Sequence, residues 1–431
     1  MSNPLTHCLE ETTIYERGSR MNILWLSHFV PYPPKGGCFQ RSYNLLKEVA
    51  RNNDVYLIAL KNKASTHPLP EMEMAKTELG KFCRQVHLID ISSRISGVSL
   101  YILAMKSLLQ GIPLSVSMFR SVELRHCIKK VCDGVRFDLV HYDTISLAEY
   151  FHDVGEVPKV LNHHGVESFM IRRRIVNEPN PLKKLYFHIE SRRLRRYEDE
   201  YCVKFHLNLA VSELDMSMLK QIAPSARFEV VENGVDIHYF APRNDYSSRD
   251  RLIFAGRLDQ YSNRDAILHF CTSVWPLISG AIPEMSFTII GNNPPPRLIE
   301  IAKNDRRIEL LGYVDDVRPY FARAMAVVCP IRDGGGTRVK ILDAMAMGMP
   351  IVSTTIACEG IDVVRGVDLL IADTPGEFKE KIREVHANGT LRATLGARAR
   401  AKAEEIYSWE IIGEKLNASY AELGTPHSAQ R

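Results

Sequence analysis

Three consecutive glycines, Gly334, Gly335 and Gly336, follow an apolar run of strand length and precede a segment with helical periodicity. Glycine lets the backbone approach a ligand closely, and the start of a helix offers free amides and a positive dipole end. Thr337 is placed to cap this helix, and Gly348 is placed to end it after about three turns. The stretch therefore predicts a phosphate-binding loop. The alternative is a tight turn with solvated charges, and a Walker P-loop is excluded because no Gly-Lys-Ser/Thr stands at the required spacing.

Charged residues surround this loop. Arg338 and Lys340 fall in the first turn of the expected helix, and Asp343 lies on the same face as Lys340, one turn deeper. Asp333 stands just before the glycines. Arg257 follows a different apolar run, where its guanidinium can clamp a diphosphate through forked hydrogen bonds. These positions predict a site for a phosphorylated ligand.

The first half of the chain has its own candidate residues. Gly36 and Gly37 follow an apolar run and open a helix, which fits either a ligand-binding turn or an ordinary loop between strand and helix. His141 and Asp143 end another apolar run, where they either line a cleft or serve the core, and we favour a structural place for His141.

Two adjacent histidines raise the question of a metal site. His163 and His164 end an apolar run and Glu167 follows, but no third ligand stands at tetrahedral spacing. We therefore expect these histidines to line the cleft as hydrogen-bond donors, and we expect no metal.

All of these residues depend on apolar runs that alternate with longer segments of helical period, a pattern typical of a parallel α/β sheet. Many runs are continuously apolar, as expected when helices cover both faces of a sheet. Ligands of such sheets bind beyond the carboxyl ends of the strands, so the cleft between two doubly wound domains is the predicted site. The expected strands are 22–27, 55–60, 86–91, 139–142, 160–163 and 207–212, then 252–255, 287–290, 308–311, 326–330, 351–354 and 369–372.

Length and composition agree with two globular domains. The 431 residues correspond to two or three domains of roughly 150 residues, and 45% hydrophobic with 25% charged residues exclude a disordered chain. We expect a disordered extension over 1–20, an N-terminal domain over 21–242, a C-terminal domain over 243–407, and a helix with a tail over 408–431. Ser408 is the expected N-cap of that last helix.

The nine cysteines form an odd set without CxxC spacing, which argues against disulfides and zinc and favours a reducing cytoplasm. The most apolar stretch, 98–109, contains Lys106 and is shorter than the roughly 20 residues of a spanning helix.

Positive charge is concentrated in one segment. Residues 171–196 carry nine lysines and arginines against two glutamates, net +7, whereas the whole chain is +4. This distribution argues against nucleic acid as a partner and predicts a local contact through residues 172–196 with an anionic bilayer or a lipid-linked diphosphate. The alternative is a solvated helix whose charges are balanced by Glu190, Glu198, Asp199 and Glu200. One face of the expected helix is apolar and should pack on the first domain; its residues are Leu182, Leu185, Tyr186, Ile189 and Tyr197. The basic residues of this segment lie mostly on the opposite face; these are Lys184, Arg192, Arg195 and Arg196.

The stretch from Pro330 to Pro350, together with Asn-Gly-Val-Asp at 233–236 and Gly256-Arg257, resembles the family 4 retaining glycosyltransferases of GT-B fold. The resemblance covers about residues 21–423 and is greatest to bacterial exopolysaccharide transferases. It implies two Rossmann-like domains that face a cleft, and a C-terminal helix that crosses back onto the first domain. It also implies transfer of a sugar from a nucleotide diphosphate sugar to a glycan or lipid-linked acceptor, with retention at the anomeric carbon and without a cofactor.

The resemblance also assigns residues. Arg257 matches the arginine that grips the donor diphosphate, and the lysine of that pair falls near Asn263, so Lys340 is expected to replace it. Asp343 matches a ribose-binding glutamate, and the matching sugar-binding glutamate falls on Gly335, where Asp333 or backbone amides are expected to substitute. The expected catalytic residues are thus Arg257 and Lys340. The expected donor-binding residues are Gly334, Gly335, Gly336, Thr337, Arg338, Asp343, Asp333 and Gly37, and those on the acceptor or sugar side are Gly36, Asp143 and His164.

Two other functions fit the same sequence. One is a nucleotide-sugar epimerase of the same fold. The other is a non-catalytic subunit that binds a nucleotide sugar, because Asn263 and Gly335 depart from the family pattern. We expect a cytoplasmic protein, either free or peripheral at the inner face of the cytoplasmic membrane.

Overall fold

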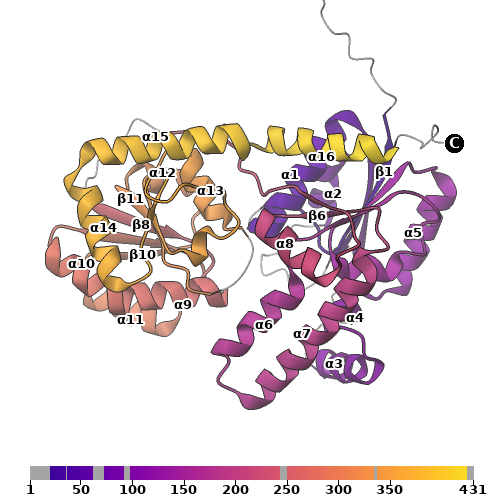
Figure 1. Ribbon diagram of the computed structural model, residues 1–431, viewed down its shortest axis with the longest axis horizontal. Helices are drawn as coiled ribbons and strands as arrows, with labels where there is room; N and C mark the ends of the chain where they lie inside the picture. The colour runs from indigo at the N-terminus through magenta and orange to yellow at the C-terminus, as the bar shows by residue number, and fades with distance from the viewer. Residues whose placement is uncertain are drawn as a thin grey trace, which may run out of the picture.

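The computed structural model describes residues 20–34, 36–61, 72–91, 98–242, 250–333 and 337–424. Two domains lie side by side, each built on a parallel sheet with helices on both faces (Figure 1). The expected extension over 1–20 lies outside the described residues except for Arg20.

The first domain has a seven-stranded sheet in the order β3-β2-β1-β4-β5-β6-β7. Its strands are short and apolar, and four of them, including β4 and β5, are buried at nearly every residue. The elements are β1 (Asn22–Ser27), α1 (Gly37–Asn52), β2 (Asp54–Lys61), α2 (Met72–Gly80), β3 (Gln85–Asp90), α3 (Val98–Gln110), α4 (Leu114–Phe119), α5 (Val122–Gly134), β4 (Leu139–Tyr142), η2 (Ile145–Tyr150), β5 (Lys159–Asn162), α6 (Glu167–Asn177), α7 (Pro181–Cys202), β6 (Leu207–Ala210), α8 (Glu213–Ile222) and β7 (Phe228–Val230).

The second domain has a six-stranded sheet in the order β10-β9-β8-β11-β12-β13. Its elements are β8 (Arg251–Ala255), α9 (Tyr261–His269), η3 (Phe270–Val274), α10 (Trp275–Ala281), β9 (Ser286–Ile290), α11 (Pro296–Asn304), β10 (Ile308–Gly312), α12 (Arg318–Ala322), β11 (Ala326–Cys329), α13 (Val339–Ala346), β12 (Ile351–Ser353), η4 (Ile356–Cys358), β13 (Leu370–Ile371), α14 (Pro375–Ala387) and α15 (Gly389–Ile406), before α16 (Trp409–Gly424).

The two sheets share one topological feature that matters for function. The strand order reverses between β1 and β4 in the first sheet and between β8 and β11 in the second. In open α/β sheets, ligands bind beyond the carboxyl ends of the strands at such a switch point. The segments that follow these four strands carry the predicted site residues, except for His164, which follows β5.

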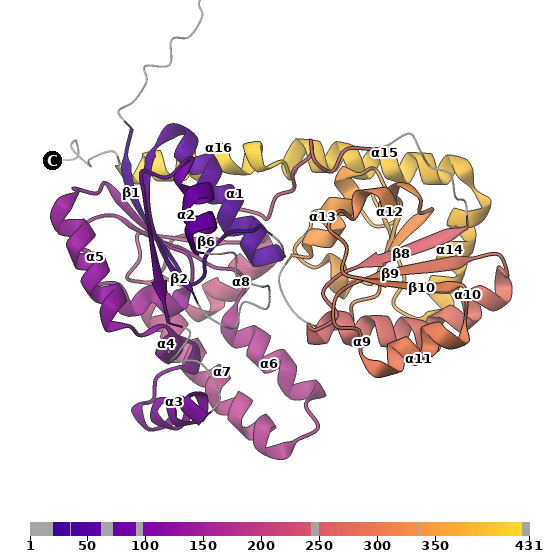
Figure 2. The same cartoon turned by 180° about the vertical axis from the view of Figure 1, so that it is seen from behind.

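The last helix, α16, crosses back to the first domain, and α15 and α16 run along one side of both domains (Figures 1 and 2). Trp409, Ile412, Leu416 and Tyr420 join the same buried cluster as Ile23 of β1. Ser408 caps the helix by accepting a hydrogen bond from the amide of Ile411 at 3.2 Å, as the sequence predicts. The crossover helix of the predicted fold is confirmed.

The expected strands are present, with ends that shift by one or two residues, and β7 is an additional strand that extends the first sheet. The predicted helix after the glycine loop differs more. It spans eight residues, about two turns, and Arg338 rather than Thr337 occupies its N-cap without a side-chain hydrogen bond. Gly348 follows its end with a φ of 65°, the left-handed conformation that favours glycine.

The basic segment folds as a hairpin of α6 and α7 that projects from the first domain (Figure 1). The expectation that its apolar residues pack on the domain is wrong for Leu182 and Leu185, which are 77% and 61% exposed. Both lie near the turn of the hairpin, beyond the reach of the domain body. No described helix is long and apolar enough to cross a membrane. The described cysteines, all but Cys8, are free.

We predict that Gly413→Ala destabilises the protein by about 1–2 kcal/mol, although alanine has the higher helix propensity. A Cβ at Gly413 of α16 would collide with the Cβ of Glu48 on α1, so the two helices would have to separate. Gly280→Ala is the matched control, because a Cβ at Gly280 of α10 would meet nothing within 4 Å. The free energy of unfolding, measured with urea, should fall only for Gly413→Ala, and a stabilised variant would contradict this packing.

Candidate functional site

Lys340 of α13 connects the segments after β8 and β11, which form the candidate site of the second domain. Its Nζ donates a hydrogen bond to Oδ1 of Asn263 at 2.7 Å and lies 4.3 Å from the centre of the Phe254 ring. Asn263 in turn donates through Nδ2 to the carbonyl of Arg257 at 2.8 Å. A Cβ at Gly256 would collide with Nζ of Lys340 and would displace that side chain. The ammonium of Lys340 thus lies against the amide of Asn263.

Arg257 is held by a neighbouring carboxylate. Its guanidinium pairs with Asp259 through two hydrogen bonds, of 2.7 Å and 3.2 Å. Both side chains are about one-fifth exposed, at the carboxyl end of β8. This forked pairing fixes the direction of the guanidinium beside the loop that contacts Lys340.

Burial shifts the protonation of two α13 residues in opposite directions. Burial lowers the pKa of Lys340 to about 8, and burial raises the pKa of Asp343 to about 8 against the attraction of Lys340. Oδ1 of Asp343 is buried and has no hydrogen-bond partner within the described residues. A buried carboxylate oxygen without a donor can accept a hydrogen bond from a hydroxyl group of a ligand.

The three glycines Gly334, Gly335 and Gly336 lie outside the described residues, whereas their neighbours are described. Nη2 of Arg338 donates to the carbonyl of Asp333 at 3.3 Å, and burial lowers the pKa of Arg338. The predicted cap is wrong: Oγ1 of Thr337 is buried near Gly360 and accepts no hydrogen bond from the described helix. Thr337 therefore lies one residue outside the N-cap position.

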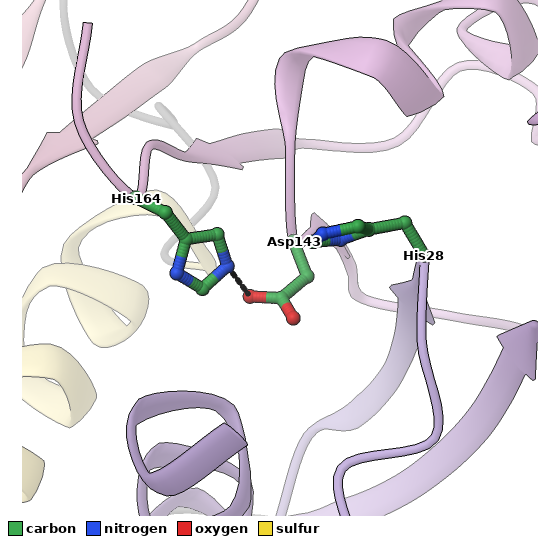
Figure 3. A group of neighbouring side chains, drawn as sticks. All are labelled: His28, Asp143 and His164. Carbon is green, nitrogen blue, oxygen red and sulfur yellow. Dashed lines mark ion pairs between the residues drawn. The ribbon is translucent and has the colours of Figure 1, made fainter. Parts of the chain in front are cut away.

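Asp143, His164 and His28 meet at the switch point of the first sheet (Figure 3). Asp143 follows β4 and is fully buried, and its Oδ1 lies 3.2 Å from Nε2 of His164. The carboxylate also accepts hydrogen bonds from Ser42 Oγ at 2.6 Å and from Asn162 Nδ2 at 2.8 Å.

The three side chains of this cluster, Asp143, His164 and His28, differ in their protonation at neutral pH. Burial opposes ionisation of Asp143, but the protonated His164 and its hydrogen bonds hold the pKa of Asp143 well below its usual range. Burial also disfavours a charged His164, yet the Asp143 carboxylate raises its pKa to about 10. Burial, with a smaller contribution from His164, lowers the pKa of His28 to about 3. At neutral pH the cluster is an imidazolium–carboxylate pair next to a neutral imidazole.

The same cluster revises the interpretation of the paired histidines. His163 does not line the cleft, because it is buried, with its Nε2 3.4 Å from Asn208 and 3.8 Å from the Cys202 sulfur. Ligand atoms of His28, Asp143 and His164 lie within 4.8 Å of one another, so His164 is grouped with residues that follow β1 and β4 and not with His163 and Glu167. This spacing could also hold a metal ion, but the imidazolium of His164 already neutralises Asp143.

His141, as expected, has a structural place. It stacks on Trp25 with ring centroids 3.6 Å apart and hydrogen bonds with the hydroxyl of Tyr420 on α16. The crossover helix therefore reaches the strand that carries Asp143.

Sequence reasoning missed Arg41, which is 1% exposed in α1. Its guanidinium donates to Asn162 Oδ1 at 2.8 Å and to the carbonyl of Glu232 at 2.7 Å. Arg41 occupies the same helical face as Leu45, and a charged residue on an apolar face is the signal that could have identified it.

The two domains meet between the candidate sites. A Cβ at Gly37, the first residue of α1, would lie 3.5 Å from Cγ2 of Val339, the first residue of α13. Gly36 precedes it with a φ of 105°, which favours glycine. Arg173 of α6 pairs with Glu359 at 2.8 Å across the domains. The helix starts of the first and second domains thus face each other.

We predict that Asp143→Asn lowers the free energy of unfolding by about 3–5 kcal/mol near pH 6, because it leaves a buried His164 without its carboxylate. The raised pKa of His164 stabilises the fold fully below its ordinary value of 6.5, and this contribution is lost as the pH rises through about 10. The difference between wild type and variant should therefore shrink toward pH 10. Urea denaturation at several pH values measures it, with the exposed Asp133→Asn of α5 as the control. A constant difference would mean that His164 is uncharged.

Comparisons with known proteins agree with this geometry. Residues 249–388 match the family described as "Glycosyl transferases group 1". An uncharacterized glycosyltransferase of Methanocaldococcus jannaschii is 25% identical over 306 residues, which cover 68% of this chain and 78% of that protein. An uncharacterized 44.6 kDa protein in the cps region of Klebsiella pneumoniae is 23% identical over 401 residues, covering 89% of this chain and 96% of that protein.

The fold is also known from solved structures. The crystal structure of Anabaena HepE in complex with UDP has a TM-score of 0.65 and 16% identity, and the alignment covers 93% of this chain and 100% of that one. This likeness shows that the chain has the GT-B fold. Together with the match of residues 249–388, it supports a glycosyltransferase whose second domain is of the group 1 type.

Proposed function

We propose that the protein transfers a sugar from a nucleotide diphosphate sugar to a glycan or lipid-linked acceptor, with retention at the anomeric carbon, in the synthesis of a cell-surface polysaccharide. One observation carries the proposal: the ammonium of Lys340 lies at Asn263, beside the Arg257 loop. This is the position where the resemblance expected a lysine. The link to polysaccharide is supported by the relative in the cps region of Klebsiella pneumoniae.

The chemistry requires stabilisation of a departing diphosphate. As the glycosidic bond breaks, positive charge develops on the sugar ring and negative charge on the leaving group. Lys340 and Arg257 supply positive charge that stabilises the leaving group. The buried Oδ1 of Asp343 accepts a hydrogen bond from a ribose hydroxyl. The leaving phosphate takes the proton of the acceptor, so no side-chain nucleophile or cofactor is needed.

The first-domain cluster adjoins α1, whose first residue, Gly37, approaches Val339 at the start of α13. The side chains of Asp143 and His164 are 0% and 15% exposed, so His164 is the member of the pair that a ligand can reach. His164 can donate a hydrogen bond to the transferred sugar or to the acceptor, while Asp143 holds its ring in place. Asp143 is a positioning residue in this proposal.

Thermal stabilisation by a panel of nucleotide sugars identifies the donor, since a ligand at 100 times its Kd adds about 2.7 kcal/mol. Product analysis then separates the functions. A new glycoside, with its anomeric configuration read by NMR, supports the retaining transferase. A changed free sugar or sugar nucleotide would instead indicate an epimerase, and binding without any product would indicate a donor-binding subunit.

We predict that Lys340→Ala lowers kcat/KM by about 100-fold or more without unfolding the protein, because it removes charge aimed at the leaving group. Steady-state kinetics with the identified donor measure the loss. Lys303→Ala, an exposed lysine of α11 in the same domain, should leave kcat/KM unchanged. Equal kinetics for Lys340→Ala and wild type would remove Lys340 from the mechanism.

We also propose that the enzyme acts at the inner face of the cytoplasmic membrane. On α3, Tyr101, Ile102, Met105 and Leu109 are 77%, 51%, 58% and 85% exposed, and their spacing places them on one helical face. Both views show α3 and the turn of the α6–α7 hairpin, with the exposed Leu182 and Leu185, at the same end of the first domain (Figures 1 and 2). Exposed apolar residues next to basic ones are typical of helices that lie in a membrane interface.

We predict that the protein sediments with vesicles that contain anionic lipid, and that high salt weakens this binding. Replacing Leu182 and Leu185 with Ser and Lys183 and Lys184 with Gln should reduce the bound fraction several-fold. The control replaces Lys129 and Lys130, exposed on α5 away from this end, with Gln. Equal sedimentation of all three proteins, or equal binding to neutral vesicles, would favour a soluble acceptor.

A further inference from the structure

A pocket lies between α6, α7 and α8 at the base of the projecting hairpin. Its volume is about 420 Å³, and its wall combines two kinds of side chain. One part is apolar, with Phe169, Met218 and Ile222. The other part is basic and consists of Arg172 from α6 and Arg192 and Arg195 from α7. The basic residues that the sequence places on the outer face of one helix thus converge with Arg172 on a cavity.

These three arginines lack a balancing carboxylate. Within the ranges that the structure describes, none of them forms an ion pair, and the hydrogen bond from Arg195 goes to the carbonyl of Gln221 at 3.3 Å. By contrast, Arg173 of the same hairpin pairs with Glu359 across the domains. Three like charges around one cavity repel each other, and a bound anion would offset that repulsion.

Three of the four acids that were expected to balance this segment have other partners, and one of them, Glu200, pairs with Lys204 at 2.7 Å. Glu190 accepts a hydrogen bond from the amide of Leu114 at 2.6 Å, and Glu198 accepts one from the amide of Ser168 at 3.1 Å. Burial raises the pKa of Glu198 to about 7, so that its negative charge is incomplete at neutral pH. The pocket therefore keeps a positive excess.

The pocket continues toward the cleft between the domains. A second, smaller hollow shares Val166, Phe169 and Met218 with it and also contacts Glu359 and Gly360 of the second domain. Val166 immediately precedes α6 and lies two residues after His164. A ligand in the pocket would thus lie next to the segment that carries His164, on the side of the contact between the domains.

We propose that this pocket binds a phosphate or diphosphate group of the sugar acceptor, with the apolar wall contacting a non-polar part of the same molecule. The inference rests on the proposed function and specifies its acceptor as anionic. Guanidinium groups suit this role because they offer forked donors that match phosphate oxygens. The phosphate can belong to a lipid-linked diphosphate or to a soluble sugar phosphate.

Isothermal titration calorimetry of the full chain with inorganic pyrophosphate tests the pocket. All proteins carry Lys340→Ala, so that pyrophosphate binding at the proposed donor site is weakened. Adding Arg172→Gln, Arg192→Gln and Arg195→Gln should weaken pyrophosphate binding at least ten-fold. Adding Arg174→Gln, Arg196→Gln and Lys220→Gln should have little effect, because these residues are exposed on the same three helices but do not line the pocket. Equal affinities in both sets would overturn the proposal.

Further measurements keep the test interpretable. Replacing the three pocket arginines with Lys retains the charge and should retain much of the pyrophosphate binding. A loss equal to that of the Gln variant would overturn the charge argument. Binding of nucleotide to wild type and to Lys340→Ala tests the donor site separately. Farnesyl diphosphate in phosphatidylcholine vesicles and glucose 1-phosphate in solution distinguish the two sources. The pocket variant should lose binding to whichever source is preferred, and binding of neither by the wild type would exclude an acceptor role.

Discussion

A single buried carboxylate determines the geometry of the first domain. Asp143 has no contact with water, and removing a carboxylate from water costs several kcal/mol unless protein donors replace the solvent. Four residues supply those donors: Ser27 at the end of β1, Ser42 of α1, Asn162 of β5 and His164 beyond it. The carboxylate is solvated only when α1, β4 and β5 are in their final places. The start of α1, with its glycine turn, is thereby fixed against the switch point of the sheet.

The second domain also buries charged side chains, but it does not supply all of their hydrogen-bond partners within the described residues. Lys340 and Asp343 lie on one short helix, and burial drives both toward their neutral forms. Within the described part of the chain, the amide oxygen of Asn263 is the hydrogen-bond acceptor of this ammonium, and Oδ1 of Asp343 has no donor. A ligand with a diphosphate and a diol would complete both interactions. The Asp143 carboxylate is thus satisfied by its own domain, whereas Oδ1 of Asp343 is left open, as the proposed donor site requires.

The strands could be predicted because residues buried on both faces must be apolar over their whole length, and β7 was missed because its three residues are too few for such a pattern. The adjacent histidines could not be separated from sequence: His163 extends a buried strand, and successive side chains point to opposite faces. Thr337 has the residue type of a cap but lies one position early, since the helix starts only at Val339. The exposed Leu182 and Leu185 have the spacing of core residues, and only the projection of the hairpin leaves them uncovered.

Arg41 is the opposite case, a charged side chain that is buried on an apolar helix face. Its hydrogen-bond partners come from β5 and from the segment after β7.

The crossover helix has a consequence for the evolution and engineering of the chain. Trp409, Ile412 and Leu416 come from the carboxyl terminus, yet they belong to the core of the first domain. A fragment that ends before the second domain would leave the α1 face uncovered, so the first domain cannot be inherited or expressed as an independent module. Exchange of the donor domain with that of another protein must retain α16 from this chain, or bring one that fits Glu48 at the close approach of Gly413. A domain exchange therefore needs two crossover points, one in the linker after β7 and one at the junction of α15 and α16. A count of two domains alone would suggest a single crossover point.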